Sequence, residues 1–335
     1  MSDPTPEPAP SAAPSPLLGL PGAVSGDGTD AAVAAHYGSF NTEQRSLARG
    51  EGFVDLSHRG VVRVSGPDRL PWLHSLTTQH LESLRPGEPS IALVLSPQGH
   101  VEHAAYVVDD GEALTAHVEP GAAGPLVDLL ERMRFMMRVE VADVTDELAV
   151  CWRPVTGGSA DVARPTSLTE GKYDLVPRDQ LEQYAAAAGP ACGMWAFEAL
   201  RIARGEPRLG LDTDHRTIPN EVGWIETAVH LEKGCYRGQE TVARVHNLGR
   251  PPRRLTLLHL DGSDNRLPAR EGVVTLDGRQ VGVVGTSARH HELGPVALGL
   301  LKRNVPVDAQ LDVDGLPATQ EVLVDPEVGL HFRAR

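Results

Sequence analysis

The stretch that decides the fold runs from Leu231 to Arg244 and reads LEKGCYRGQETVAR. It places one cysteine, Cys235, in a short run with two glycines and a dense set of charges. Gly234 and Gly238 allow the chain to turn tightly or to approach another backbone closely. Residues 239–245 contain no strong helix breaker, so the pattern predicts that a helix starts at Gln239. Cys235 is therefore expected just before the N-terminus of a helix.

A cysteine in this setting is predicted to be reactive. Free amide groups and the positive end of the helix dipole favour a thiolate, and the flanking Lys233 and Arg237 act in the same direction. A thiol with a lowered pKa is a better nucleophile, metal ligand or redox partner at neutral pH. The alternative is a small buried hydrophobe, which is the usual role of an isolated cysteine. The glycines and cations around Cys235 favour the reactive interpretation.

Lys233 to Glu240 reads KGCYRGQE, which matches the K-G-C-Y-x-G-Q-E signature of the YgfZ-type folate-binding proteins. Those proteins resemble the aminomethyltransferase (T-protein) of the glycine cleavage system. Two further segments follow the T-protein order, an R-I-x-x-G-x-P loop at 201–207 and a P-x-E-x-G segment at 219–223. The resemblance runs from about Val54 to the C-terminus. Its motif residues here are Lys233, Gly234, Cys235, Tyr236, Gly238, Gln239 and Glu240, followed by Arg244.

The resemblance implies an α+β protein with a T-protein-like three-lobed ring, made of two α+β domains and a small C-terminal antiparallel β-barrel. The expected boundaries are 46–145 for the first, folate-binding-type domain, 146–250 for the second, and 251–335 for the barrel. Short strands at regular spacing after Pro252 and a hairpin signal at Asp277–Gly278 independently predict an antiparallel barrel. Residues 1–45 are expected to be a disordered tail because proline, alanine, serine and glycine dominate the first thirty residues.

The resemblance also implies tetrahydrofolate or a derivative as cofactor. A pterin ring requires a flat aromatic platform, and the glutamate tail of a folate requires cations. Trp195, Phe197 and Trp224 are candidate platforms, although a place in the core is the alternative for each. Which of Trp195 and Phe197 corresponds to the aromatic residue that the family uses stays open. Arg201 is a candidate for the tail, and Glu221 of the P-x-E-x-G segment completes the predicted ligand set.

Two departures from the T-protein pattern weaken the prediction of an aminomethyltransferase. T-proteins carry an acidic pair, G-x-x-D-D, where this chain has Glu102 and His103. They also hold the pterin with a glutamate at the position of Ala203. Conversely, T-proteins usually lack the cysteine that stands here at Cys235. Whether the chain is an enzyme is therefore left open by its sequence.

Composition excludes several classes of function. The net charge of −14 argues against direct binding to nucleic acid or to an anionic membrane. No run approaches the ~20 apolar residues of a membrane span, and no signal peptide is recognised. The three cysteines, Cys151, Cys192 and Cys235, form no C-x-x-C motif and no local cluster with histidine. No metal site or disulfide framework is predicted, and cysteine usage fits a cytoplasmic protein.

The resemblance implies a folate-binding accessory protein for the assembly or repair of iron–sulfur clusters, acting through Cys235. Its expected partners are folate and iron–sulfur assembly factors or client iron–sulfur proteins. An effect on tRNA modification would be indirect, through iron–sulfur enzymes that modify tRNA. The first alternative is a tetrahydrofolate-dependent aminomethyl or methyl transferase. The second is a non-catalytic scaffold that keeps the fold without a ligand.

Overall fold

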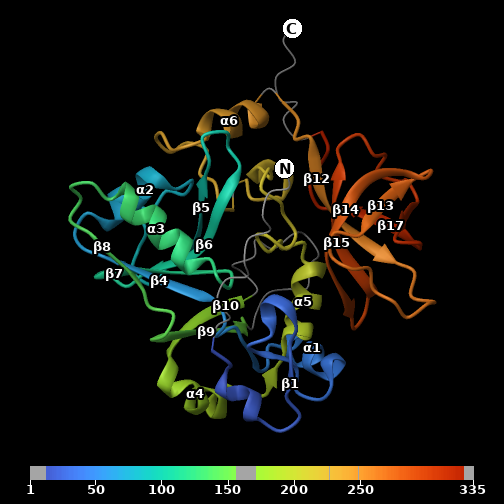
Figure 1. Ribbon diagram of the computed structural model, residues 1–335, viewed down its shortest axis with the longest axis horizontal. Coiled ribbons are helices and arrows are strands. Elements are labelled where there is room, and N and C mark those ends of the chain that lie inside the picture. Colours follow the sequence, from blue (N-terminus) through green and yellow to red (C-terminus); the bar gives the residue numbers. More distant parts are fainter. Residues whose placement is uncertain (1–12, 156–170, 226, 248, 328–335) are drawn as a thin grey trace, which may run out of the picture.

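The three larger β-sheets, one in each lobe, organise the chain around a common centre (Figure 1), and a two-stranded sheet, β1-β2, lies in the N-terminal segment. The computed structural model describes residues 13–155, 171–225, 227–247 and 249–327. The α+β class and the three-lobed arrangement predicted from the sequence are both confirmed.

The first lobe is a five-stranded antiparallel sheet in the order β5-β6-β7-β4-β8. Its apolar face is covered by two helices, which contribute Leu73, Leu126 and Leu130 to a core shared with Val62 and Val64. The elements are β4 (Gly60–Ser65), α2 (Arg69–Leu76), β5 (Pro89–Leu95), β6 (Val101–Asp109), β7 (Ala113–Val118), α3 (Ala123–Met133) and β8 (Glu140–Asp143).

The second lobe has a four-stranded sheet in the order β10-β9-β3-β11, with α1, α4 and α5 around it (Figure 1). Strands β3 and β4 are close in sequence yet belong to different sheets, so the expected boundary at 145/146 does not separate the two sheets. The elements are α1 (Phe40–Ala48), β3 (Phe53–Asp55), β9 (Leu148–Pro154), β10 (Gly171–Pro177), η3 (Arg178–Gln180), α4 (Leu181–Ala187), β11 (Ala191–Cys192) and α5 (Met194–Ala203).

The third lobe is a closed six-stranded antiparallel barrel, as the sequence predicts. The Asp277–Gly278 pair forms its predicted hairpin turn, and both residues have positive φ, at 50° and 72°. A turn of this hand matches the twist of the strands it joins. The strands are β12 (Arg253–Leu260), β13 (Val273–Leu276), β14 (Arg279–His290), β15 (Gly294–Lys302), β16 (Leu311–Val313) and β17 (Leu316–Val322).

The N-terminal segment corrects one expectation. Within the predicted tail, residues 13–45 form short ordered elements, and Leu17 and Val33 are buried in the cores of the second lobe. The prediction of disorder is therefore wrong for these residues, because their few apolar side chains are covered by a lobe formed later in the chain. The elements are η1 (Pro16–Gly19), β1 (Val24–Ser25), η2 (Gly28–Asp30), β2 (Ala34–His36) and the start of α1.

One apolar core joins the lobes at the centre. It combines Leu93 of β5, Ile202 of α5 and Leu298 of β15 with two side chains of the cysteine-bearing stretch, Tyr236 and Val242. Between α5 and the barrel, the chain forms η4 (Pro219–Glu221) and α6 (Gln239–Asn247). The stretch that carries Cys235 is thus anchored where the lobes meet.

Candidate functional site

Residues 230–238, called the cysteine loop below, alternate between buried and exposed side chains. Lys233 and Tyr236 are 5% and 9% exposed, whereas Gly234, Cys235 and Arg237 lie at the surface. Helix α6 begins at Gln239, as predicted, four residues after Cys235. The loop therefore presents its thiol to solvent on a backbone that is fixed from both sides.

Lys233 anchors the loop to the end of α2. Its Nζ donates hydrogen bonds to the carbonyl oxygens of His74, Thr77 and Gln79, the last two at 2.5 and 3.2 Å. Carbonyl groups at a helix C-terminus lack partners within the helix, and a cation is favoured there. Burial lowers the pKa of the Lys233 ammonium to about 8. The lysine of the motif thus joins the loop to the first lobe, and its predicted support of a Cys235 thiolate stays a prediction.

Arg237 pairs with Glu102 of β6, with 3.0 Å between Nη1 and Oε2. Two features that the sequence presents separately therefore meet in space: the arginine of the motif and the glutamate that replaces the T-protein acidic pair. Both side chains are more than a third exposed. The Glu102 carboxylate therefore has a cationic partner from the motif.

Gly238 and Gly99 allow the cysteine loop to approach the turn between β5 and β6. Gly238 has φ +79°, and a Cβ there would lie 2.5 Å from the carbonyl oxygen of Ser96. Gly99 has φ +85°, and a Cβ there would lie 2.7 Å from the Cβ of Thr241 on α6. Gly238 therefore permits the close backbone approach that the sequence predicts. At Gly234, in contrast, an added Cβ would meet nothing within 4 Å.

The three cysteines differ in environment. Cys151 and Cys192 are buried, at 0% and 1% exposed, while Cys235 is exposed. Burial raises the pKa of the Cys192 thiol to about 12 and raises that of Cys151 further. A protonated, buried thiol is a poor nucleophile. Cys235 is therefore the cysteine available for chemistry.

A cavity of about 460 Å³ lies between α5, the N-terminal segment and the barrel. Trp195, half exposed, and Phe40 give it an aromatic wall, with their ring centroids 5.9 Å apart. Arg270 and Arg289 supply cations on the barrel side, where Arg270 also pairs with Glu271 and Arg289 also donates to the carbonyl oxygen of Asn265. Carboxylates line the other side, from Asp27, Asp30 and Glu198. No residue of the cysteine loop lines this Trp195 cavity. The thiol of Cys235 therefore does not belong to this cavity.

Three of the other predicted ligand residues are structural. Phe197 and Trp224 are 2% and 7% exposed and belong to apolar cores, so neither offers a free ring face. Arg201 is buried, and its guanidinium donates to Glu198, Asp212 and Thr286. Its donors are therefore engaged by protein groups and are not free for a glutamate tail.

Glu221 has a structural contact of its own. Its carboxylate accepts a hydrogen bond from the Ile218 backbone and forms an ion pair with Arg253 of β12. Its position in the P-x-E-x-G segment thus joins η4 to the barrel. The remaining motif residues Glu240 and Arg244 are exposed on α6.

A buried charge network joins the N-terminal segment to the first lobe and α5, and the sequence analysis did not predict it. Arg208 donates to Asp30 with both terminal nitrogens, at 2.8 and 2.9 Å, and to Glu119 at 2.7 Å. His58 also contacts Asp30, at 2.8 Å, and Glu198 accepts from Arg208 at 3.1 Å. These residues, called the Arg208 network, are separated by up to 178 positions, so no local pattern reveals them.

Comparison with known proteins supports the fold and identifies distant relatives of the chain. No family model matches the chain. It is 26% identical to a putative chloroplastic transferase of Arabidopsis thaliana, over 79% of this chain and 69% of that protein. It is also 26% identical to the aminomethyltransferase of Geobacillus kaustophilus, over 84% and 88%. A mitochondrial iron–sulfur cluster assembly factor IBA57 homolog of Pyricularia oryzae is 25% identical over 68% of this chain and 63% of its own length.

Among solved structures, the glycine cleavage system aminomethyltransferase T of Bartonella henselae superposes with a TM-score of 0.76. The match covers 94% of this chain and 97% of that protein at 18% identity, and it confirms the T-protein-like fold. Within the described part of the chain, none of the helices is long and apolar enough to cross a bilayer.

Proposed function

We propose that this chain is a cytoplasmic folate-binding accessory protein of the YgfZ type, and that it serves the assembly or repair of iron–sulfur clusters through Cys235. The observation that carries the proposal is the exposure of Cys235 on an anchored loop, in contrast to two buried cysteines. Among the relatives, an iron–sulfur cluster assembly factor homologue supports the same direction. Iron–sulfur assembly factors or client iron–sulfur proteins would be the partners.

The chemistry assigned to Cys235 is that of a thiolate ligand. The thiol releases its proton to solvent, and the sulfur then donates an electron pair to an incoming iron ion. Arg237 and the N-terminal end of α6 lie on the same stretch as Cys235, and their predicted support of a thiolate is part of the proposal. The anchors at Lys233 and Tyr236 hold the loop in place when the ligand leaves.

The residues of the Trp195 cavity fit a folate. Its volume lies in the range of small-molecule sites. Trp195 and Phe40 would contact the pterin ring, and Arg270 and Arg289 would pair with the carboxylates of the glutamate tail. A bound tetrahydrofolate would supply one-carbon or reducing chemistry, while these side chains orient it and exclude water. Trp195 is the member of the predicted ligand set that this assignment keeps.

The thiol role is tested by replacing Cys235 with serine in the host and measuring the activity of an iron–sulfur enzyme such as aconitase. We expect reduced activity with unchanged amounts of folded protein. Alkylation of the native protein with iodoacetamide, read by mass spectrometry, should label Cys235 and spare Cys151 and Cys192. Wild-type iron–sulfur activities in the Cys235→Ser strain would end the proposal of a reactive thiol.

The folate role is tested by fluorescence titration with folinic acid. We expect quenching of the wild-type protein, weaker quenching for Trp195→Phe, and wild-type quenching for the matched control Trp224→Phe, whose tryptophan is buried in the core. No quenching of the wild-type protein at high micromolar ligand would favour a scaffold that works without folate.

The alternative function is a tetrahydrofolate-dependent aminomethyl or methyl transferase, which the aminomethyltransferase relatives favour. The Glu102 contact with Arg237 speaks against it, since the carboxylate at that position is paired. Purified protein supplied with an aminomethyl donor and tetrahydrofolate distinguishes the two. Turnover that is lost in Glu102→Gln would establish the transferase, whereas folate binding without turnover would favour the accessory role.

A further inference from the structure

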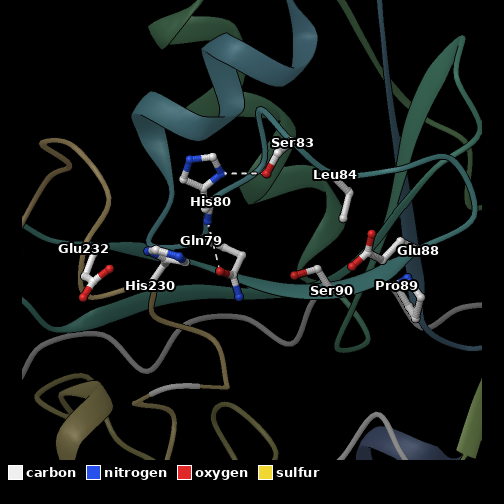
Figure 2. A pocket seen from close by; sticks show the side chains of 9 residues that line it. All are labelled: Gln79, His80, Ser83, Leu84, Glu88, Pro89, Ser90, His230 and Glu232. Carbon is white, nitrogen blue, oxygen red and sulfur yellow. Dashed lines mark hydrogen bonds between the residues drawn. The ribbon is translucent and has the colours of Figure 1, made fainter.

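Three histidines from two distant parts of the chain meet beside the cysteine loop. The ring centroids of His74, on α2, and His80 are 4.7 Å apart, and those of His80 and His230 are 5.2 Å apart. His80 and His230 line one side of a polar pocket of about 520 Å³ (Figure 2). His230 is the first residue of the cysteine loop. The residues His74, His80 and His230 are called the histidine cluster below.

The donor atoms of this cluster have the spacing of an open metal site. One ring nitrogen each of His74 and His80 and one carboxylate oxygen of Glu82 all lie within 4.8 Å of one another. Metal–ligand bonds of about 2 Å bring such atoms to roughly 3.3 Å apart. Glu82 is exposed, so rotation of its side chain can close that difference.

The hydrogen bonding of the rings independently points to a ligand. The Nδ1 atom of His74 is buried and has no hydrogen-bond partner among the described residues. Such a nitrogen is costly to leave unpaired. His80 has its Nδ1 within 3.1 Å of the Ser83 hydroxyl, an outer contact that fixes the ring and leaves Nε2 free (Figure 2).

We propose that His74, His80 and Glu82 bind a divalent first-row transition metal ion such as Zn²⁺ or Fe²⁺, with His230 positioned to add a further nitrogen. Imidazole ligands favour these ions over Mg²⁺ and Ca²⁺. The Lys233 ammonium opposes a dication here, and the carboxylates of Glu82 and Glu232 offset it. Because His230 and Lys233 both belong to the cysteine loop, the ion would also stiffen the segment that carries Cys235. The proposal requires neither a folate nor the thiol.

The test uses the full chain without an affinity tag, stripped with a chelator and titrated with Co²⁺ or Zn²⁺. We expect one equivalent to bind, with d–d absorption for Co²⁺, and affinity to fall at least tenfold in His80→Gln and in Glu82→Gln. Glu82 is exposed, so its variant should fold normally, and melting of both variants without metal checks this. His259→Gln on the barrel is the matched control and should bind as the wild type does.

Two results would overturn the proposal. The first is the absence of stoichiometric binding by the wild-type protein. The second is wild-type affinity in both His80→Gln and Glu82→Gln. If Cys235→Ser abolished binding while those two variants kept it, the ion would belong to the thiol and the histidine site would be rejected. Retained binding in Cys235→Ser supports the site even where that variant shows no effect on iron–sulfur enzymes.

Discussion

The cysteine loop and the Arg208 network both depend on a buried cation, yet they use it differently. Lys233 donates to three backbone carbonyl groups and leaves its neighbour Cys235 at the surface. Arg208 donates to three carboxylates, which are themselves mostly buried. The first arrangement fixes a loop and keeps one side chain reachable, whereas the second fixes whole elements and encloses its charges.

The same contrast applies to the predicted ligand residues, because a residue that belongs to a motif is not always one that can contact a ligand. Arg201 lies in the R-I-x-x-G-x-P loop, but its guanidinium donates hydrogen bonds to Glu198, Asp212 and Thr286. Trp195 lies six residues earlier on α5 and is half exposed in a cavity. Two residues on the same helix thus divide into one that builds the fold and one that is free to bind.

The largest effect is expected from Arg208→Met. Its loss brings Asp30 and Glu119 together without their shared cation, and breaking a buried ion pair costs about 3 to 5 kcal/mol. Because His58 and Arg59 still contact these carboxylates, we expect the lower end of that range. Urea denaturation measures the free energy of unfolding. The exposed Arg216→Met is the control, and a loss below about 1 kcal/mol in Arg208→Met would show that the network contributes little.

Acid should weaken the Arg208 network more gradually than Arg208→Met does. Protonation removes the charge of a carboxylate, whereas the substitution leaves the carboxylate charged and without its partner. Burial alone would raise the pKa of Asp30 and Glu119, but hydrogen bonds and charge from Arg208, together with His58 or Arg59, hold both below their ordinary values. Such carboxylates stabilise the fold fully above their unfolded pKa of about 4, and that contribution is lost as the pH falls through the folded pKa. The free energy of unfolding should therefore fall below about pH 5, and less steeply in Asp30→Asn. Equal slopes would assign the acid sensitivity elsewhere.

Local patterns predicted the elements whose stability is local. Short strands at regular spacing and the Asp277–Gly278 turn predicted the barrel, and the absence of breakers after Gly238 predicted the start of α6. The N-terminal segment could not be predicted in the same way. Its order depends on contacts such as Asp30 with Arg208, which join residues 178 positions apart. Composition indicates how much apolar surface a segment can bury by itself, but it does not predict an ion pair such as that of Asp30 with a distant arginine.

The candidate site divides along the same line. The motif predicted that Cys235 lies just before a helix, and α6 does begin at Gln239, but it did not predict that Lys233 and Tyr236 anchor the loop. The pairing of Arg237 with Glu102 and the meeting of His80 with His230 depend on the packing of separate lobes. Neither the acidic position nor the histidine spacing indicates such partners in the sequence.

Lys233→Met should cost about 2 kcal/mol, less than Arg208→Met, because carbonyl groups left behind carry no net charge. The effect should be local. Amide hydrogen exchange of residues 227–238 should accelerate, whereas the barrel should exchange as in the wild type. Lys302→Met is the matched control, since its exposed ammonium contacts one carbonyl group on the barrel. Unchanged exchange in the cysteine loop would mean that Tyr236 and the glycines suffice to hold it.

The smallest effect on stability is expected from Arg237→Gln. Its pair with Glu102 is exposed to solvent, and pairs of this kind contribute about 0.2 to 1 kcal/mol. A double-mutant cycle with Glu102→Gln measures that coupling, and Arg85→Gln, which breaks another exposed pair, is the control. Arg237→Gln alone should also slow the alkylation of Cys235, because a nearby cation favours the thiolate. Slower alkylation with little change in stability would show that Arg237 supports the thiol more than the fold, whereas a large coupling with unchanged alkylation would place Arg237 with Arg208 among the structural cations.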